Sequence, residues 1–209
     1  MLLKTYDRIM ELFNGHRGYM NFSQLKNSHV TIKQIQELES RDVIDCFSRG
    51  WYWCSECGYE RPADYKYIEI AKVNPHAVIC LDSACFKHGI LSREPETVAV
   101  ATERTDRRKM NFSYPVRRYY LQNLGNEGEI ESVITGFGDY RIYSLERTIC
   151  DCVRLKDKID KDIYIDIINN FHMKEDQKMR IYMYAKFLRA AKNMDDYISD
   201  TEKLNFKDG

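Results

Sequence analysis

The chain has 209 residues, of which 44% are hydrophobic, so it is long enough to bury one large core or two smaller ones. Thirty-two Lys and Arg residues balance thirty-two Asp and Glu residues. This balance excludes a histone-like polycation and an acidic disordered chain, but not a local basic patch. The apolar runs are far shorter than the roughly 20 residues of a membrane span, and the charged N-terminus does not resemble a signal peptide. We therefore expect a soluble, cytoplasmic protein with no membrane partner.

The seven cysteines are odd in number and follow no secretion signal, which favours reduced thiols. One pair, Cys54 and Cys57, has the Cys-x-x-Cys spacing that can chelate a tetrahedral zinc ion. A closed site needs two further ligands, and Cys46, His16 and His29 are the remaining candidates. We expect no cofactor, and a structural zinc at Cys54 and Cys57 stays open as the alternative to a metal-free dithiol.

The first forty residues predict three helices. Apolar residues recur at helical spacing, and a tight turn over 27–29 separates the second helix from the third. Thr31 is the expected N-cap of the third helix, in which Ile32, Ile35 and Leu38 form the predicted core stripe. The expected helices are over 2–13, around 22–25, and over 31–41.

Two short β-type runs, VIDCF and WYW, follow and are joined by Ser48-Arg49-Gly50, a turn in which Gly suits a positive φ. Helix, short helix, turn, helix and hairpin is the order of a winged helix-turn-helix, whose second paired helix lies in the DNA major groove. A helical module for protein contacts is the alternative, because residues 1–53 are nearly neutral, with seven basic and six acidic residues. The residues that we expect to contact DNA are Ser28, His29, Thr31, Lys33, Gln34, Gln36, Arg41 and Arg49.

The remainder of the chain alternates between helical and β-type patterns. The expected segments are helices over 63–73 and 76–88, strands over 97–102, 112–122, 129–135 and 140–143, and helices over 144–158, 162–172 and 179–192. Pro115 confines its strand to a sheet edge or a bulge. The predicted fold class is α+β, with a winged helix-turn-helix over 1–56, a linker and connecting helix over 57–74, and a mixed α/β domain with a small sheet and several helices over 75–209.

A basic stretch interrupts the otherwise even distribution of charge. Between Glu103 and Tyr120 there are six basic residues and two acids. A segment with this excess suits phosphate or an acidic protein surface, and an exposed loop with solvated charges is the simpler alternative. The six basic residues are Arg104, Arg107, Arg108, Lys109, Arg117 and Arg118.

The sequence contains no pattern typical of an enzyme. A Gly-rich phosphate loop, a GxSxG elbow and an HExxH zinc motif are all missing from it. The most reactive-looking cluster is Glu146, Arg147 and Asp151, on a helix that Ser144 is expected to cap. Arg147 and Asp151 are four residues apart and can pair on one helix face, so a structural ion pair explains them without catalysis.

Three motifs in order resemble the AbiEi-type antitoxins of type IV toxin–antitoxin systems, a family also described as transcriptional regulators. SRGWYW, from Ser48 to Trp53, is similar to the family's "SRGVY" signature. NPHAVICLDSACFKHGI, from Asn74 to Ile90, resembles a family helix through Pro75, Ala77, Ser83, Ala84, His88 and Gly89. YSLERTICDCVR matches a third block through Ser144, Glu146, Arg147, Thr148 and Asp151. The resemblance covers roughly residues 15–190.

The resemblance implies a non-enzymatic antitoxin that represses its own operon. Its winged helix would bind double-stranded operator DNA, and its C-terminal domain would counteract a nucleotidyltransferase-type toxin without a stable complex. The alternative from a different class is a protein-interaction module whose basic 104–118 segment binds an acidic partner, without sequence-specific DNA binding. His88, Ser144, Glu146, Arg147 and Asp151 match the family pattern, and we interpret them as scaffold.

Overall fold

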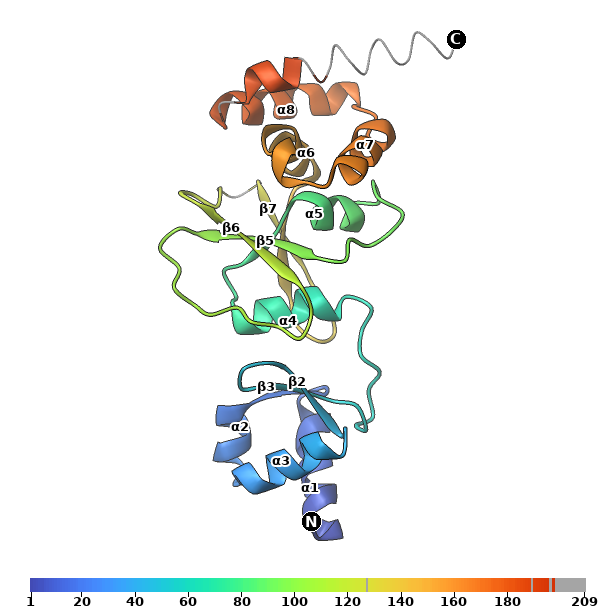
Figure 1. Ribbon diagram of the computed structural model, residues 1–209, viewed down its shortest axis with the longest axis vertical. Helices are drawn as coiled ribbons and strands as arrows, with labels where there is room; N and C mark the ends of the chain where they lie inside the picture. The colour runs from blue at the N-terminus through green and yellow to red at the C-terminus, as the bar shows by residue number, and fades with distance from the viewer. Residues whose placement is uncertain (127, 189, 196, 198–209) are drawn as a thin grey trace. The chain divides into compact units, whose positions relative to one another are not determined.

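The computed structural model describes residues 1–126, 128–188, 190–195 and 197, and these residues form a mixed α+β structure (Figure 1). The predicted α+β class is therefore confirmed. The chain divides into two compact units, each of which is made of three separate stretches of sequence. The N-terminal unit comprises Met1–Pro75, Arg107–Val116 and Ile134–Tyr140, and the C-terminal unit comprises His76–Asp106, Arg117–Val133 and Arg141–Gly209.

The N-terminal unit contains a three-stranded antiparallel sheet and four helices among its described residues. Its elements are α1 (Leu3–Gly15), β1 (Tyr19–Asn21), α2 (Phe22–Asn27), α3 (Ile32–Ser40), β2 (Ile44–Ser48), β3 (Trp51–Cys54) and α4 (Tyr65–Val73). The strand order is β1-β3-β2, with Tyr19 opposite Trp53 and Cys46 opposite Tyr52. Side chains from α1, α2, α3 and the sheet share one core.

Local sequence signals explain how these elements begin and turn. Thr31 caps α3, as expected, and forms a reciprocal capping box with Gln34. Gly50 has φ +74 in the β2–β3 turn, so the predicted hairpin is confirmed. Gly18 has φ +83, and a Cβ there would lie 2.4 Å from the Trp53 ring. Only glycine therefore allows the chain to pass from α1 into β1 at this point.

The predicted core stripe of α3 is correct at two of its three positions. Ile35 and Leu38 are buried, whereas Ile32 is 60% exposed. A spacing of three residues turns 300° around a helix, so each step drifts by 60° and the first member leaves the buried face. Ile32 is therefore a surface residue at the start of α3.

The C-terminal unit is built on a five-stranded sheet of order β6-β5-β4-β8-β7. Its elements are β4 (Val78–Ile79), α5 (Leu81–Lys87), β5 (Val98–Glu103), β6 (Val116–Leu121), β7 (Ile130–Val133), β8 (Tyr140–Tyr143), α6 (Leu145–Arg154), a 3₁₀ turn (Lys156–Lys158), α7 (Lys161–Asn170) and α8 (Glu175–Phe187). β4 pairs antiparallel with β5 and parallel with β8. Helix α6 packs against α5 and α8, and these helices and the sheet share the unit's core (Figure 1).

Two predicted elements of this part of the chain are wrong in extent or type. The expected helix over 76–88 is a short strand, β4, followed by α5, because Val78 and Ile79 pair with strands distant in sequence. The expected strand over 112–122 is regular only over β6, which follows Pro115 at the sheet edge as predicted. The predicted N-cap at Ser144 is confirmed, since its hydroxyl accepts a hydrogen bond from the Arg147 N–H. Within the described residues, no helix has the length and apolar character needed to cross a membrane.

Candidate nucleic-acid interface

The turn between α2 and α3 contains no glycine, and a histidine takes the left-handed backbone conformation there. His29 has φ +60, in the left-handed region that rarely suits a residue other than glycine. The Val30 N–H then donates to the Leu25 carbonyl at 2.9 Å, which closes the end of α2. Arg8 of α1 donates to the Ser28 carbonyl at 2.7 Å. The two helices therefore meet at a defined angle, with the exposed His29 ring at the turn.

At the start of α3, two of the predicted DNA-contacting residues bond to each other. The Thr31 N–H donates to Gln34 Oε1 at 2.8 Å, and the Gln34 N–H donates to Thr31 Oγ1 at 3.3 Å. Both side-chain oxygens are thereby occupied, and the Gln34 amide NH₂ and the Thr31 hydroxyl proton are the donors that remain. Lys33 and Gln36 are exposed on the outer surface of the same helix. Among the α3 residues that we predict to read bases, Lys33 and Gln36 are therefore the two that take no part in the capping box.

Arg41 lies at the opposite end of α3 and has local partners. Its guanidinium is 3.9 Å from Glu37 Oε1 and 5.8 Å from the centre of the Tyr6 ring. The predicted role of Arg41 as a backbone contact therefore requires it to leave a weak, exposed ion pair, which costs little.

The tip of the β2–β3 hairpin presents a cation. Arg49 is exposed and is followed by Gly50, whose backbone conformation makes the turn tight. A bulge between Cys46 and Ser48 shifts the register just before this tip. The tip is therefore small, and Arg49 is its one basic side chain.

The six residues of the predicted basic patch divide between the two units. Arg107, Arg108 and Lys109 belong to the N-terminal unit, and Arg104, Arg117 and Arg118 belong to the C-terminal unit. In β6, the Arg117 guanidinium donates to the Lys158 carbonyl at 3.1 Å. Arg118 donates to Thr102 Oγ1 at 2.6 Å and to the Asp106 carbonyl at 3.0 Å. The six residues thus do not all belong to one unit, and the two strand arginines have structural partners.

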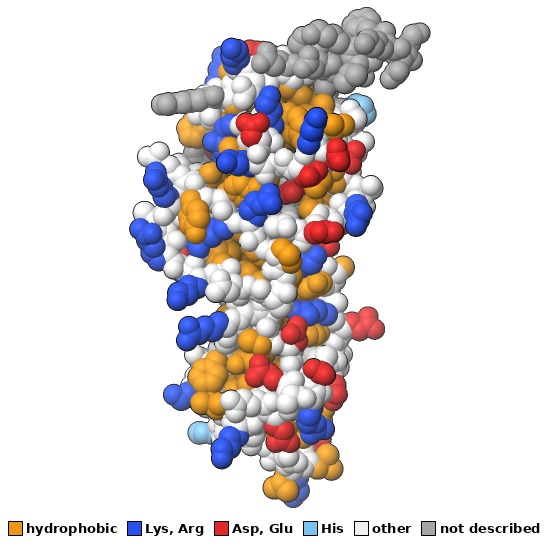
Figure 2. All heavy atoms as spheres, viewed as in Figure 1, with side chains coloured by type: hydrophobic (Ala, Val, Ile, Leu, Met, Phe, Trp, Pro, Cys, Tyr) orange, Lys and Arg blue, Asp and Glu red, His pale blue; other side chains and the backbone are white. Residues whose placement is uncertain are grey.

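In the face of the molecule that Figure 2 shows, basic, acidic and hydrophobic side chains are interspersed. This mixture agrees with the balanced composition of the chain. On this face, attraction to a polyanion would come from small groups of cations rather than from a broad positive field.

The predicted metal pair is close in the structure but differs in exposure. Cys54 is buried beside Met10, and the Cys57 thiol donates to the Cys54 carbonyl at 3.1 Å. Burial and the neighbouring Cys57 raise the pKa of Cys54 to about 12, which disfavours the thiolate that a metal needs. Within the described ranges, three or more His, Cys, Asp or Glu side chains do not gather into a metal-binding group. A zinc ion at this pair remains a prediction.

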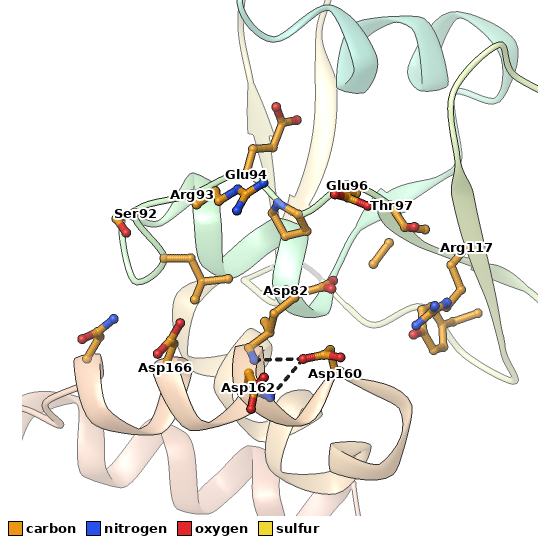
Figure 3. A pocket seen from close by; sticks show the side chains of 16 residues that line it. Asp82, Ser92, Arg93, Glu94, Glu96, Thr97, Arg117, Asp160, Asp162 and Asp166 are labelled. Carbon is orange, nitrogen blue, oxygen red and sulfur yellow. Dashed lines mark hydrogen bonds between the residues drawn. The ribbon is translucent and has the colours of Figure 1, made fainter.

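A pocket of about 470 Å³ in the C-terminal unit has more carboxylates than cations in its lining (Figure 3). Its charged lining residues are Asp82, Glu94, Glu96, Asp160, Asp162 and Asp166, with Arg93 and Arg117. Asp160 caps α7, and its Oδ1 accepts from the N–H groups of Asp162 at 3.0 Å and Ile163 at 3.4 Å. Burial raises the pKa of Asp82. Since carboxylates outnumber cations, this pocket is unsuited to a phosphate backbone.

The residues that match the third family motif make internal contacts. Arg147 is 2% exposed, and it bonds to Asp151 at 2.9 Å and to Glu129. Glu146 pairs with Arg180 of α8 at 2.7 Å. The His88 Nε2–H donates to the Tyr143 carbonyl at 2.7 Å. These contacts tie α5, α6 and α8 to the sheet of the C-terminal unit.

Sequence reasoning missed a buried ionic cluster in the N-terminal unit. Glu69 of α4 is fully buried, and Arg61 bonds to its Oε1 at 2.6 Å. The Tyr19 hydroxyl donates to the same oxygen at 3.3 Å. The sequence indicates this cluster only by the position of Glu69, which stands between two isoleucines in the mostly apolar helix YKYIEIAKV.

No protein-family model matches this chain, and no curated protein matches it. The resemblance to the AbiEi-type antitoxins therefore rests on the three sequence motifs.

Proposed function

We propose that the protein is a DNA-binding transcriptional repressor of the AbiEi antitoxin kind. The observation that carries this proposal is the chain order of the N-terminal unit. Two capped helices, α2 and α3, meet at a tight turn and are followed by the β2–β3 hairpin, and β1 completes the sheet. This order supports a winged helix-turn-helix, in which α3 is the recognition helix and the hairpin is the wing.

The exposed side chains suit the groups that such a domain must contact. Lys33 can donate to guanine O6 and N7, and Gln36 can pair with adenine N6 and N7 in the major groove. Arg49 at the wing tip can pair with phosphate, which fixes position without reading sequence. Thr31 and Gln34 serve chiefly to shape the first turn of α3, through their capping box.

The test is a titration of the purified protein against the DNA upstream of its own gene, at two salt concentrations. We expect saturable binding that survives competitor DNA and weakens at higher salt. The double variant K33Q/R49Q should bind less tightly, and its salt dependence should be shallower by about one unit because the phosphate contact of Arg49 is lost. Unchanged binding by K33Q/R49Q would refute this docking geometry. Binding of the wild type no stronger than to unrelated DNA would refute the repressor function.

The antitoxin activity is proposed from the family motifs in the C-terminal unit. The chain counteracts a nucleotidyltransferase-type toxin, and the matched residues of α5 and α6 hold that unit together. Co-expression with a toxin encoded next to the gene should restore growth to cells that the toxin arrests. Failure to restore growth, with the protein present at normal levels, would separate this activity from repression and leave the repressor proposal untouched.

A further inference from the structure

The basic segment Arg107–Ser113 of the N-terminal unit ends against the edge of the wing hairpin, where its last three residues contact β2. Ser48, the last residue of β2, forms an antiparallel bridge with Phe112. The Ser113 N–H donates to the Phe47 carbonyl at 3.0 Å, and the Ser48 hydroxyl donates to the Asn111 carbonyl at 2.7 Å. Residues 111–113 therefore pair with the end of β2 immediately before the wing tip.

A second set of contacts fixes the basic end of this segment. The Arg108 guanidinium donates to Asn74 Oδ1 at 3.0 Å, and Asn74 Nδ2 donates to the Met110 sulfur at 3.5 Å. Asn74 is fully buried. Because a buried amide holds residues on both sides of Lys109, the backbone there is positioned before any ligand binds. Such preorganisation lowers the entropy cost of association.

The cations on either side of Arg108 face solvent. Arg107 and Lys109 are exposed, and their side chains have no ion pair or hydrogen bond among the described residues. The same is true of Arg49 at the wing tip. Chain length alone keeps the Cα atoms of Arg49 and Lys109 within about 20 Å of each other, since both adjoin the Ser48–Phe112 bridge.

The charge of the unit also depends on this segment. Residues 1–75 carry ten basic and ten acidic residues, whereas residues 107–116 carry three basic residues and no acid. A winged domain that ended at residue 75 would be neutral. The segment supplies the positive charge that a neutral domain lacks for binding a polyanion.

We propose that Arg107 and Lys109 form a second wing that contacts the phosphate backbone of duplex DNA beside Arg49. This inference rests on the proposed DNA binding and adds a contact outside the winged helix. Measured along the helix axis, a span of at most about 20 Å covers up to about six phosphates of one strand, so three cations can each meet a separate phosphate. An acidic protein is less suited, because Asn74 anchors the backbone on both sides of Lys109, and cations on a fixed backbone suit the regular spacing of phosphates.

The test measures binding of the full chain to an unrelated 30-base-pair duplex and to the upstream DNA, over a series of KCl concentrations. The variant is R107Q/K109Q, and the matched control is K156Q/K158Q, which removes two exposed cations from the C-terminal unit. R107Q/K109Q should bind both duplexes about tenfold more weakly at 0.1 M salt, with a log–log salt slope shallower by about 1.8. The charge-keeping variant R107K/K109R should bind as the wild type does.

The outcomes separate the two proposals. If K33Q/R49Q weakens binding but R107Q/K109Q behaves like K156Q/K158Q on both duplexes, the second wing is refuted and the repressor proposal stands. If the wild type does not prefer the upstream DNA but R107Q/K109Q still lowers affinity and slope on the unrelated duplex, the phosphate contact stands and sequence-specific repression fails. If the wild type binds neither duplex, both are refuted.

Discussion

The fully buried carboxyl of Glu69 shows how one residue links the sheet, helix and loop of the N-terminal unit. Burial raises its pKa to about 7, although the Arg61 guanidinium acts in the opposite direction. Arg61 also pairs with Asp45 of β2 at 3.0 Å, and Lys72, one turn after Glu69, donates to the Phe137 carbonyl at 2.8 Å. The charges around α4 thus hold pieces of the chain that lie far apart in sequence.

This pKa gives a pH dependence of stability with a definite sign. Glu69 keeps its proton in the folded state up to about pH 7, whereas in the unfolded state it loses the proton near its usual 4.5. The folded state therefore binds more protons between these values, and the free energy of unfolding falls as pH rises through this window. The fall is at most about 3 kcal/mol for a shift of this size.

Glu69→Gln should remove this contribution. We expect the difference in unfolding free energy between wild type and E69Q, measured by urea denaturation, to decrease from pH 5 to pH 7.5. The exposed Glu11→Gln serves as the control and should leave the wild-type pH profile intact. A parallel pH profile for wild type and E69Q would contradict the predicted role of Glu69.

At the scale of elements, the sequence correctly predicts the helix caps and turns that depend on residues close together in the chain. Thr31 and Ser144 cap their helices as expected, and Gly50 makes the hairpin turn, because each effect involves residues within a few positions. The local pattern of Val78 and Ile79 predicts a helix, whereas pairing with β5 and β8 on either side makes them strand β4. The bridge between Ser48 and Phe112 is equally non-local. Helical period alone therefore predicts helix α3 but not the segment that pairs with the end of β2.

The capping box of α3 leads to a prediction about stability. Thr31→Ala removes the oxygen that accepts the Gln34 N–H and should lower the free energy of unfolding by about 1 kcal/mol. Thr31→Ser keeps a hydroxyl and should retain most of that stability. Urea unfolding followed by circular dichroism measures both variants. Equal stabilities for wild type, T31A and T31S would show that the Thr31 cap does not contribute to the free energy of unfolding.

At the scale of the whole molecule, the N-terminal unit is not a continuous stretch of sequence. Residues 107–116 and 134–140 belong to it, although each is flanked by C-terminal strands. Arg17 donates to the Gly136 carbonyl, and the Tyr114 hydroxyl donates to the Lys66 carbonyl at 3.0 Å. The chain beyond residue 75 therefore completes the surroundings of α4.

A fragment of residues 1–75 should accordingly keep the α1–α3 core but loosen α4. The contacts that Lys66, Lys72 and Asn74 make with later segments are lost in the fragment, whereas the core shared by α1, α2, α3 and the sheet lies wholly within it. Hydrogen exchange should therefore be faster at α4 amides in the fragment than in the full chain, with much smaller changes in α1 and β3. Equal protection of α4 in both would mean that the later segments do not stabilise it. Addition of a 107–116 peptide should partly restore protection if docking of that segment along β2 is intrinsic to its sequence.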